Sequence, residues 1–324
     1  MYKYRADINN IGGSLMFRRY MFYGFLCLIL VFGACTSEKA EPEKATGEKT
    51  SETAESGQTH LGDCILVTPT GEVPEKLYQV SEVVPTDEYK PFTKKLLVYG
   101  ITLIGRDDIS DEFMRKVAKT ITEMFPQEGE GIDTELQKEV LGNLYRYKAV
   151  IPFFLGHEHD FAPELEAVWK VTRSKNSICD IIMEGVPGQV NEVVEHILHF
   201  VTDVGLHYTF PEEWGISKTS TVYQAMQEAI DKEYYIIEQY GMQDEEVKNR
   251  VLIQEFAYWL IGSAWNFLEP YAPDAEWKII RTKSDLKEKL PLSYELFENT
   301  IPKVMVSPSI ATLEELKKFA RSEN

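Results

Sequence analysis

The sequence lacks most of the short motifs that mark common enzyme classes. It has no GxSxG segment for a serine nucleophile, no glycine-rich dinucleotide fingerprint and no P-loop, so neither serine hydrolysis nor nucleotide binding is expected. It also lacks internal repeats and the paired Glu-x-x-His segments of a di-iron bundle. Basic residues are scarce, with 34 Lys and Arg against 52 Asp and Glu. The net charge of −18 would repel phosphates, which excludes a nucleic-acid partner.

Apolar runs long enough to span a bilayer are lacking too, but a shorter one lies near the start. Two arginines precede an apolar core from Tyr20 to Phe32, and small residues come before Cys35. This layout predicts a signal peptide over residues 1–34. The ending VFGAC resembles the lipobox of bacterial lipoproteins, although Phe32 replaces the usual leucine. We therefore expect a bacterial cell-envelope protein, held at the membrane through lipidated Cys35 on the periplasmic or surface side. A plain signal anchor is the alternative.

The next segment has very few apolar residues. Residues 35–61 are rich in Ser, Thr, Glu and Lys, a composition typical of a flexible tether, so we expect one folded domain over 62–324. No CxxC spacing points to zinc or redox chemistry. Cys64 and Cys179 remain for the folded part, where one structural disulfide can form in an oxidising compartment.

The first half of this domain mixes strands with a helix. Segments 94–105, 145–156 and 179–184 are rich in β-branched and aromatic residues and are predicted as strands. Between the first two, apolar residues at helical spacing predict a helix over 110–125 that begins at an N-cap, Ser110.

The second half is predicted to be helical almost throughout. Helical patterns cover 188–205, 221–241 and 245–271, and Gly241 is a plausible C-cap for the second of these. The segment 312–319 begins with a capping-box pattern, Thr312 and Glu315. The order predicts an α+β fold, with a small N-terminal sheet and helices followed by a mostly helical half.

The segment 188–205 carries the strongest functional signal. Glu195 and His199 lie one helical turn apart, and His196, His199 and Asp203 form a polar stripe. The residues between them are apolar, so this helix should be buried. Burying charges is costly unless they are paired or bind a metal. These side chains are therefore candidate metal ligands.

The letters EHILH (195–199) resemble the HExxH motif of zincin metallopeptidases, with the first two positions exchanged. The order of elements and the segment QEFAYWLIGSAWNF (254–267) are similar to the lethal-factor-like branch of that superfamily. The resemblance implies a zincin-like domain in which Glu195, His199 and Glu255 bind zinc. His196 then stands at the position of the catalytic glutamate, where it would orient or deprotonate a bound water.

Three functional hypotheses follow from this segment. The site binds zinc and hydrolyses a peptide or another amide, or it is a degenerate scaffold that recognises a peptide or protein. A third reading is a non-catalytic surface lipoprotein that binds a protein or glycan, with structural histidines. His157 and His159 in LGHEHDF (155–161), together with Asp203 and His207, are auxiliary candidates around the site.

Overall fold

The computed structural model describes residues 60–272 and 276–321. The expected signal peptide, the lipidated Cys35 and most of the expected tether lie outside these residues. The exception is His60–Leu61, the last two residues of that tether, which form strand β1 and so belong to the fold. All of the described residues belong to one compact unit.

Seven strands are present in the described part of the chain. They are β1 (His60–Leu61), β2 (Ile65–Leu66), β3 (Val84–Pro85), β4 (Lys94–Val98), β5 (Ile101–Gly105), β6 (Val150–Leu155) and β7 (Ile182–Glu184).

Helices account for most of the remaining elements. They are α2 (Asp111–Met124), α3 (Thr134–Arg146), α4 (Pro163–Arg173), α5 (Gln189–Phe200), the π-helix η2 (Val201–Leu206), α6 (His207–Thr209), α7 (Pro211–Trp214), α8 (Thr221–Asp231), α9 (Glu245–Ala264), α10 (Leu268–Tyr271), α11 (Lys283–Lys289), α12 (Pro291–Val304), α13 (Ile310–Leu316) and the 3-10 helix η3 (Lys317–Phe319). The α+β class is thereby confirmed.

Strands β3 to β7 form one sheet in chain order, and β1 pairs with β2 in a separate hairpin. The first three strands of the sheet are antiparallel, whereas β5, β6 and β7 are parallel. The segment 94–105, expected as a single strand, is a hairpin of β4 and β5. Tyr99 and Gly100 both have positive φ, at 46° and 84°, which is the backbone of a two-residue hairpin turn.

The other expected strands are shorter than their sequence patterns. Helix α3 continues to Arg146, so β6 starts only at Val150. Strand β7 starts at Ile182, because the three residues before it leave the sheet. The helix expected over 110–125 is present as α2, and the Ser110 side chain accepts a hydrogen bond from the Phe113 N–H as an N-cap.

Some helix ends in the second half differ from the prediction. Helix α9 ends at Ala264 rather than near Tyr271, and α10 follows as a separate short helix. Helix α8 ends at Asp231 rather than near Gly241, because Tyr235 turns into the core and pairs its backbone with Trp277. The capping box expected at Thr312 and Glu315 is wrong. Helix α13 begins earlier, with Ser309 as its N-cap.

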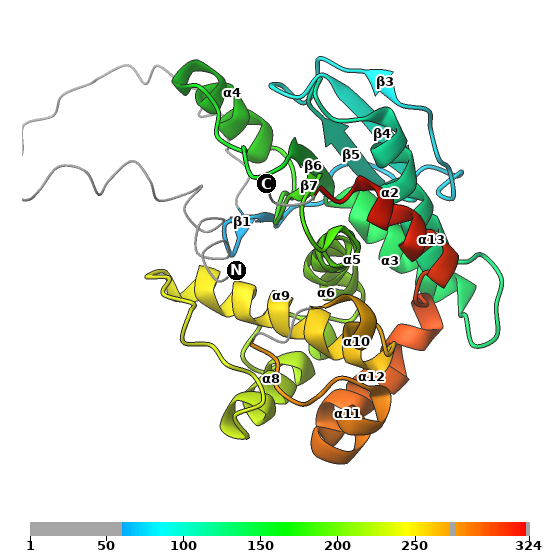
Figure 1. The fold of residues 1–324 in the computed structure, drawn as a ribbon, viewed down its shortest axis with the longest axis vertical. Helices are drawn as coiled ribbons and strands as arrows, with labels where there is room; N and C mark the ends of the chain where they lie inside the picture. Colours follow the sequence, from blue (N-terminus) through cyan, green and yellow to red (C-terminus); the bar gives the residue numbers. More distant parts are fainter. Residues whose placement is uncertain (1–59, 273–275, 322–324) are drawn as a thin grey trace, which may run out of the picture. The chain divides into compact units, whose positions relative to one another are not determined.

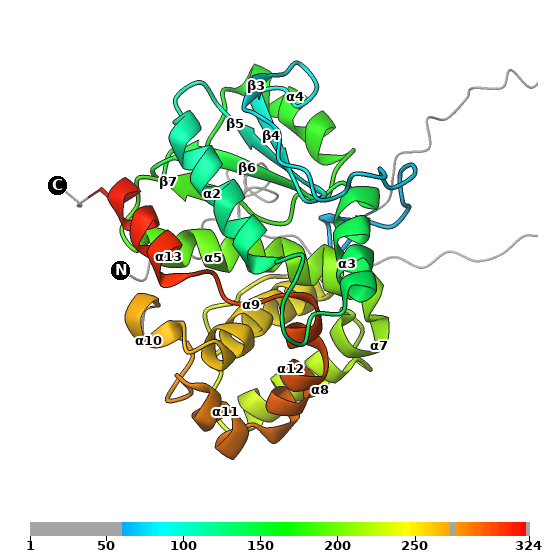
Figure 2. The same cartoon turned by 90° about the vertical axis from the view of Figure 1, so that its right-hand side faces the viewer.

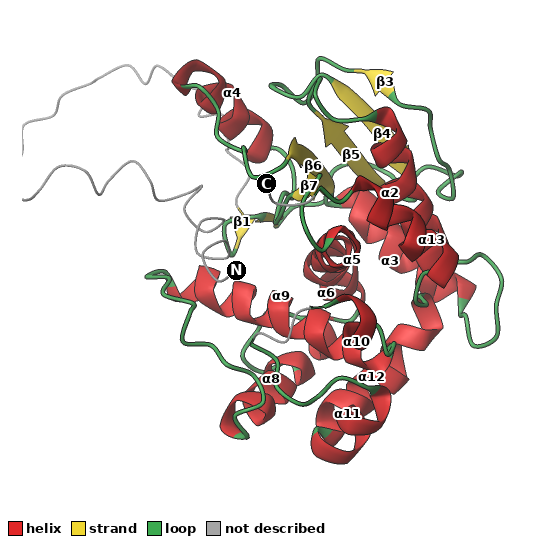
Figure 3. Ribbon diagram, in the orientation of Figure 1, coloured by secondary structure: helices red, strands yellow, loops and turns green. Residues whose placement is uncertain are grey.

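The two halves are stacked, with the sheet above and most helices below (Figures 1 and 3). A small apolar cluster that contains Phe92, Phe154 and Trp169 fills one face of the sheet, under α4. The large core fills the other face and continues into the helical half. Helix α5 crosses the middle of this core, and α9 passes directly beneath it (Figure 2). Among the described residues, no helix has the length and apolarity needed to cross a membrane.

Candidate metal site

Helix α5 carries the predicted ligands in the centre of the molecule. It packs against β7 above and α9 below, so eleven of its twelve residues are buried. Its apolar residues, among them Val193, Val194 and Ile197, are fully enclosed in the core. The polar side chains of α5 must consequently find their partners inside the protein.

The three expected metal ligands meet between α5 and α9. Glu195, His199 and Glu255 each offer one ligand atom, and these atoms lie within 4.8 Å of one another. The exposed fractions of the three residues are 4%, 0% and 8%. His199 Nε2 is 3.9 Å from Glu255 Oε2 and has no hydrogen-bond partner among the described residues. A buried ring nitrogen thus faces carboxylates at distances that one metal ion could bridge.

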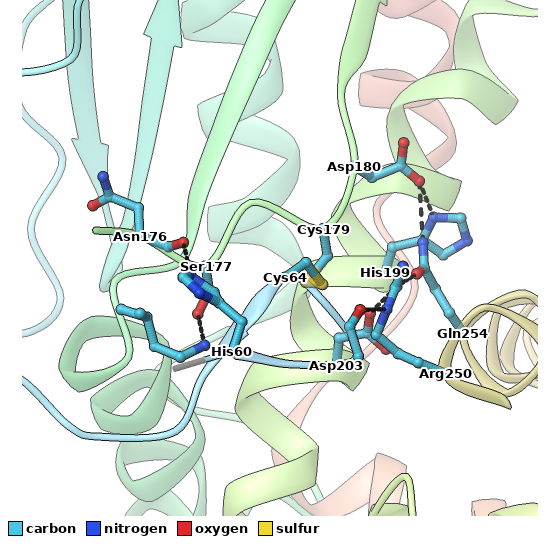
Figure 4. The surroundings of a disulfide bond; sticks show 12 residues. His60, Cys64, Asn176, Ser177, Cys179, Asp180, His199, Asp203, Arg250 and Gln254 are labelled. Carbon is cyan, nitrogen blue, oxygen red and sulfur yellow. Dashed lines mark hydrogen bonds and ion pairs between the residues drawn. A yellow bond between two sulfur atoms is a disulfide. The ribbon is translucent and has the colours of Figure 1, made fainter. Parts of the chain in front are cut away.

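The other nitrogen of the same ring is held by a residue that the sequence did not reveal. His199 Nδ1 donates to Asp180 Oδ2 at 2.6 Å, and Gln254 Nε2 donates to the same oxygen at 3.1 Å (Figure 4). Because Asp180 accepts the Nδ1 proton, the Nε2 lone pair is directed away from Asp180. A carboxylate behind a histidine fixes its tautomer and ring orientation in this way in many metal sites.

Glu195 is positioned by a chain of hydrogen bonds that joins the two helices. Asn191 Nδ2, one turn earlier on α5, donates to Glu195 Oε2 at 2.6 Å. The Tyr258 hydroxyl on α9 donates in turn to Asn191 Oδ1. Tyr258 also presents its ring to the edge of His199, with centroids 6.3 Å apart. His199 and Glu195 are therefore both held in place by hydrogen bonds to buried side chains.

His196 faces a different set of acids. Its Nδ1 lies 3.0 Å from Glu192 Oε1, and its Nε2 lies 3.8 Å from Asp180 Oδ2. Burial lowers the pKa of His196, but the carboxylates of Asp180, Glu192 and Glu195 outweigh burial and raise it to about 10. With Asp180 and His199, His196 forms a second group that can hold a metal. Its expected role on a metal-bound water stays a prediction.

The pKa values of Asp180 and His199 are shifted in opposite directions. Burial raises the pKa of Asp180, yet His196 and His199 more than compensate and hold it well below its usual range. Burial lowers the pKa of His199, but Glu255 and Asp180 raise it overall. Both shifts arise from close opposite charges in a place with little water.

Asp203 and His207 do not join this cluster. Asp203 lies on η2 and forms an ion pair with Arg250, whose Nη1 is 3.0 Å from Asp203 Oδ2. Burial raises the pKa of Asp203 to about 6, even though Arg250 opposes the shift. His207 Nδ1 accepts a hydrogen bond from the Ile216 N–H at 3.3 Å, and burial lowers its pKa to about 4. The expected polar stripe thus divides after His199.

The histidines of the segment 155–161 also lie apart from the cluster. His157 is exposed, and His159 is half-buried beside the Phe154 ring, with centroids 6.2 Å apart. Neither belongs to a group of potential metal ligands in the described part of the chain.

Sequence reasoning missed the supporting residues Asp180, Asn191, Gln254 and Tyr258. Two of them could have been found from the sequence, because Asn191 and Gln254 are polar residues within apolar helical segments. A buried amide needs hydrogen-bond partners, so each indicates a polar neighbour in the core. Asp180 gave no such signal, since it stands at the start of a short segment that resembles an ordinary strand.

Comparison with known protein families, with curated proteins and with solved structures found no match. What the site can bind is therefore inferred from the geometry of its residues alone. Buried His, Asp and Glu side chains converge here in groups that could hold a metal ion.

Proposed function

We propose that this chain is a membrane-tethered lipoprotein whose domain holds a zinc ion on Glu195, His199 and Glu255. The observation that carries the proposal is the buried Nε2 of His199, which faces the Glu255 carboxylate and lacks a hydrogen-bond partner among the described residues. Burying such an atom without a partner is costly, and a cation between Nε2 and the carboxylates removes that cost.

The donor set fits zinc. Zinc binds imidazole nitrogen and carboxylate oxygen at about 2.0–2.2 Å, and three protein ligands with one open position are typical of catalytic zinc. Ligand atoms within 4.8 Å of one another need only small side-chain movements to reach these bonds. Asp180 behind His199, and Asn191 behind Glu195, supply the outer hydrogen bonds that such ligands usually have.

The charge of the cluster supports a cation as well. Asp180, Glu192, Glu195 and Glu255 supply four carboxylates around two imidazoles. With His196 protonated and His199 neutral, as metal binding at its Nε2 requires, the cluster carries a charge of −3, which one divalent ion reduces to −1. Arg250, on the same helix as Glu255, is already paired with Asp203.

A zinc ion in such a site polarises a carbonyl and lowers the pKa of a bound water. In HExxH enzymes a glutamate then takes the proton of that water. Here His196 occupies the corresponding position, but its two nitrogens face Glu192 and Asp180. This arrangement favours the degenerate form of the site, which binds zinc and recognises a peptide or protein without efficient hydrolysis.

The edge of the sheet at β7 argues against a substrate strand bound there, and so against efficient peptide hydrolysis. Peptides often bind as an added strand along an edge such as that of β7. The Met183 N–H donates to Glu192 Oε1 at 2.8 Å, the Gly185 N–H donates to Gln189 Oε1 at 2.7 Å, and Gln189 Nε2 donates to the Met183 carbonyl at 2.7 Å. Side chains of α5 thus occupy the backbone groups that a substrate strand would need.

Metal analysis of the purified full-length chain tests the proposal. We expect one zinc per wild-type chain and less than a tenth of that in His199→Ala and Glu255→Gln at the same free zinc concentration. His157→Ala and Glu238→Gln are matched controls, because both side chains are exposed. They should retain the wild-type zinc content.

Two outcomes contradict the proposal. Wild-type protein that binds no zinc at micromolar free metal rules out the site. Zinc that remains in both His199→Ala and Glu255→Gln must be bound elsewhere. A peptide-hydrolysis assay of the zinc-loaded protein separates the two forms, since efficient turnover would rule out the degenerate one.

A further inference from the structure

A third group of potential metal ligands shares no residue with the expected zinc site. The sulfur atoms of Cys64 and Cys179 and a carboxylate oxygen of Asp203 lie within 4.8 Å of one another (Figure 4). The two sulfurs are joined in a disulfide, as the sequence allowed. Thiolates, not disulfides, are the strong metal ligands. In the oxidised form this group therefore has only one effective ligand.

We propose that reduction of this disulfide creates a binding site for a thiophilic divalent cation such as zinc, with Cys64, Cys179 and Asp203 as its protein ligands. A dithiol reductant gives two electrons and two protons to the disulfide and itself becomes a disulfide. The cation then displaces both thiol protons to solvent as the metal–sulfur bonds form. A small-molecule disulfide reverses the sequence and releases the cation.

The positions of the three residues suit a tetrahedral ion. The Cα atoms of the cysteines are 5.0 Å apart. Two zinc–sulfur bonds of about 2.3 Å at a tetrahedral angle place the sulfurs roughly 3.8 Å apart, which the freed side chains reach by rotation. The same geometry places a carboxylate oxygen about 3.5 Å from each sulfur. Asp203, already within 4.8 Å of both, has little more than about 1 Å to move.

The electrostatics of the pocket suit the same ion. Two thiolates and one carboxylate carry a charge of −3, and a divalent cation reduces it to −1. Arg250, whose Nη1 lies 3.0 Å from Asp203 Oδ2, supplies the remaining positive charge. Cys64 and Asp203 are buried, so a neutral filled site avoids the cost of an uncompensated charge.

The segments that carry these three ligands are held in place by contacts other than the disulfide. The hairpin of β1 and β2 carries Cys64 in its turn and is also held by several hydrogen bonds to the rest of the domain, including the two that follow. The Leu66 N–H donates to Ser177 Oγ at 2.9 Å, and Arg250 Nε donates to the Gly62 carbonyl at 2.8 Å. Asp203 lies within η2, and π-helical turns are frequent at functional sites. The three ligands should therefore stay together after reduction.

Cobalt(II) substitution tests the proposal, because a thiolate ligand gives cobalt a near-ultraviolet charge-transfer band that oxygen and nitrogen ligands do not. The full-length chain in detergent is titrated with cobalt before and after treatment with a phosphine reductant. The band should appear only after reduction and be absent from Cys64→Ser/Cys179→Ser. It should persist in His199→Ala, which lacks the expected zinc site. Failure of that site thus leaves this test intact.

A separate variant tests the role of Asp203 as the third ligand. Asp203→Asn should weaken cobalt binding by the reduced protein at least about tenfold, since even outer partners of ligands change affinity by that much. Asp231→Asn, an exposed acid on α8, is the matched control and should bind like wild type.

Two results would overturn the proposal. One is a reduced protein that keeps its native circular dichroism spectrum but shows no thiolate band with cobalt. The other is loss of that spectrum on reduction in the presence of cobalt, because the cation then fails to hold the hairpin in place.

Discussion

Replacement of Asp180 tests whether His199 is prepared as a metal ligand. Asp180 Oδ2 accepts hydrogen bonds from His199 Nδ1 at 2.6 Å and from Gln254 Nε2 at 3.1 Å. Asp180→Asn keeps an acceptor oxygen at this place but removes the charge. Asp180→Ala removes the acceptor and leaves two buried donors without it. The pair of variants therefore separates the effect of charge from that of orientation.

The expected magnitudes follow from these contacts. A hydrogen bond to an ionised acceptor is about twice as strong as a neutral one, so Asp180→Asn should cost roughly 1–1.5 kcal/mol of zinc binding. This corresponds to about a tenfold rise in Kd. Asp180→Ala also frees the ring of His199 to rotate, so we expect a rise of about 100-fold, at the upper end for such supporting residues.

Competition with a chromophoric chelator at fixed pH measures both Kd values, with Asp231→Asn and Asp231→Ala as controls for exposed acids. The reasoning is refuted if folded Asp180→Ala binds zinc as tightly as wild type. In that case the hydrogen bond between Asp180 and His199 does not prepare the ligand.

Two further predictions concern stability. The folded pKa of His207 is about 4, below its ordinary value, so the unfolded state binds more protons between about pH 6.5 and 4. As the pH falls from about 6.5 to 4, the unfolding free energy of wild type should therefore decrease by up to about 3 kcal/mol more than that of His207→Asn. Urea unfolding measures both, and equal decreases would contradict the assignment. A Cβ at Gly205 would lie 2.9 Å from Val140 Cγ1. Gly205→Ala should lower the unfolding free energy by about 1–3 kcal/mol, whereas Gly241→Ala, with open space around it, should not.

The sequence predicted the elements that have a clear period. Helix α2 and its cap follow from apolar spacing and one serine, and Glu195 and His199 share a face because four residues make about one helical turn. The approach of Glu255 followed from the resemblance rather than from any local pattern. A single sequence does not fix how two distant helices meet.

The errors have physical causes in tertiary structure. The pattern over 221–241 is helical to its end, but burial of Tyr235 against the rings of Phe256 and Trp277 outweighs that local preference. Glu315 resembles a capping residue, yet its carboxylate binds Lys116 and Lys119 of α2. Asp180 lies in an irregular stretch before β7, where no period indicates which way a side chain points.

The resemblance of EHILH to HExxH leads to a last prediction, because the acids around position 196 favour a cationic side chain there. Glu195→His/His196→Glu gives the segment the HExxH order but places a third carboxylate beside those of Glu192 and Asp180. The His196 nitrogens lie 3.0 Å and 3.8 Å from these acids. The double variant should lose about 3–5 kcal/mol of unfolding free energy, as when one partner of a buried ion pair is removed.

Addition of Glu192→Gln should recover about half of this loss, since one of the two facing charges is gone while the amide oxygen can still accept from the Met183 N–H. Urea unfolding of the metal-free proteins measures both effects, and Glu195→His alone is the control for the ligand position. If the double variant is as stable as wild type, position 196 tolerates either charge. If it is destabilised and Glu192→Gln rescues it, the surrounding acids suit a histidine at 196, and the two substitutions alone do not give a stable HExxH segment.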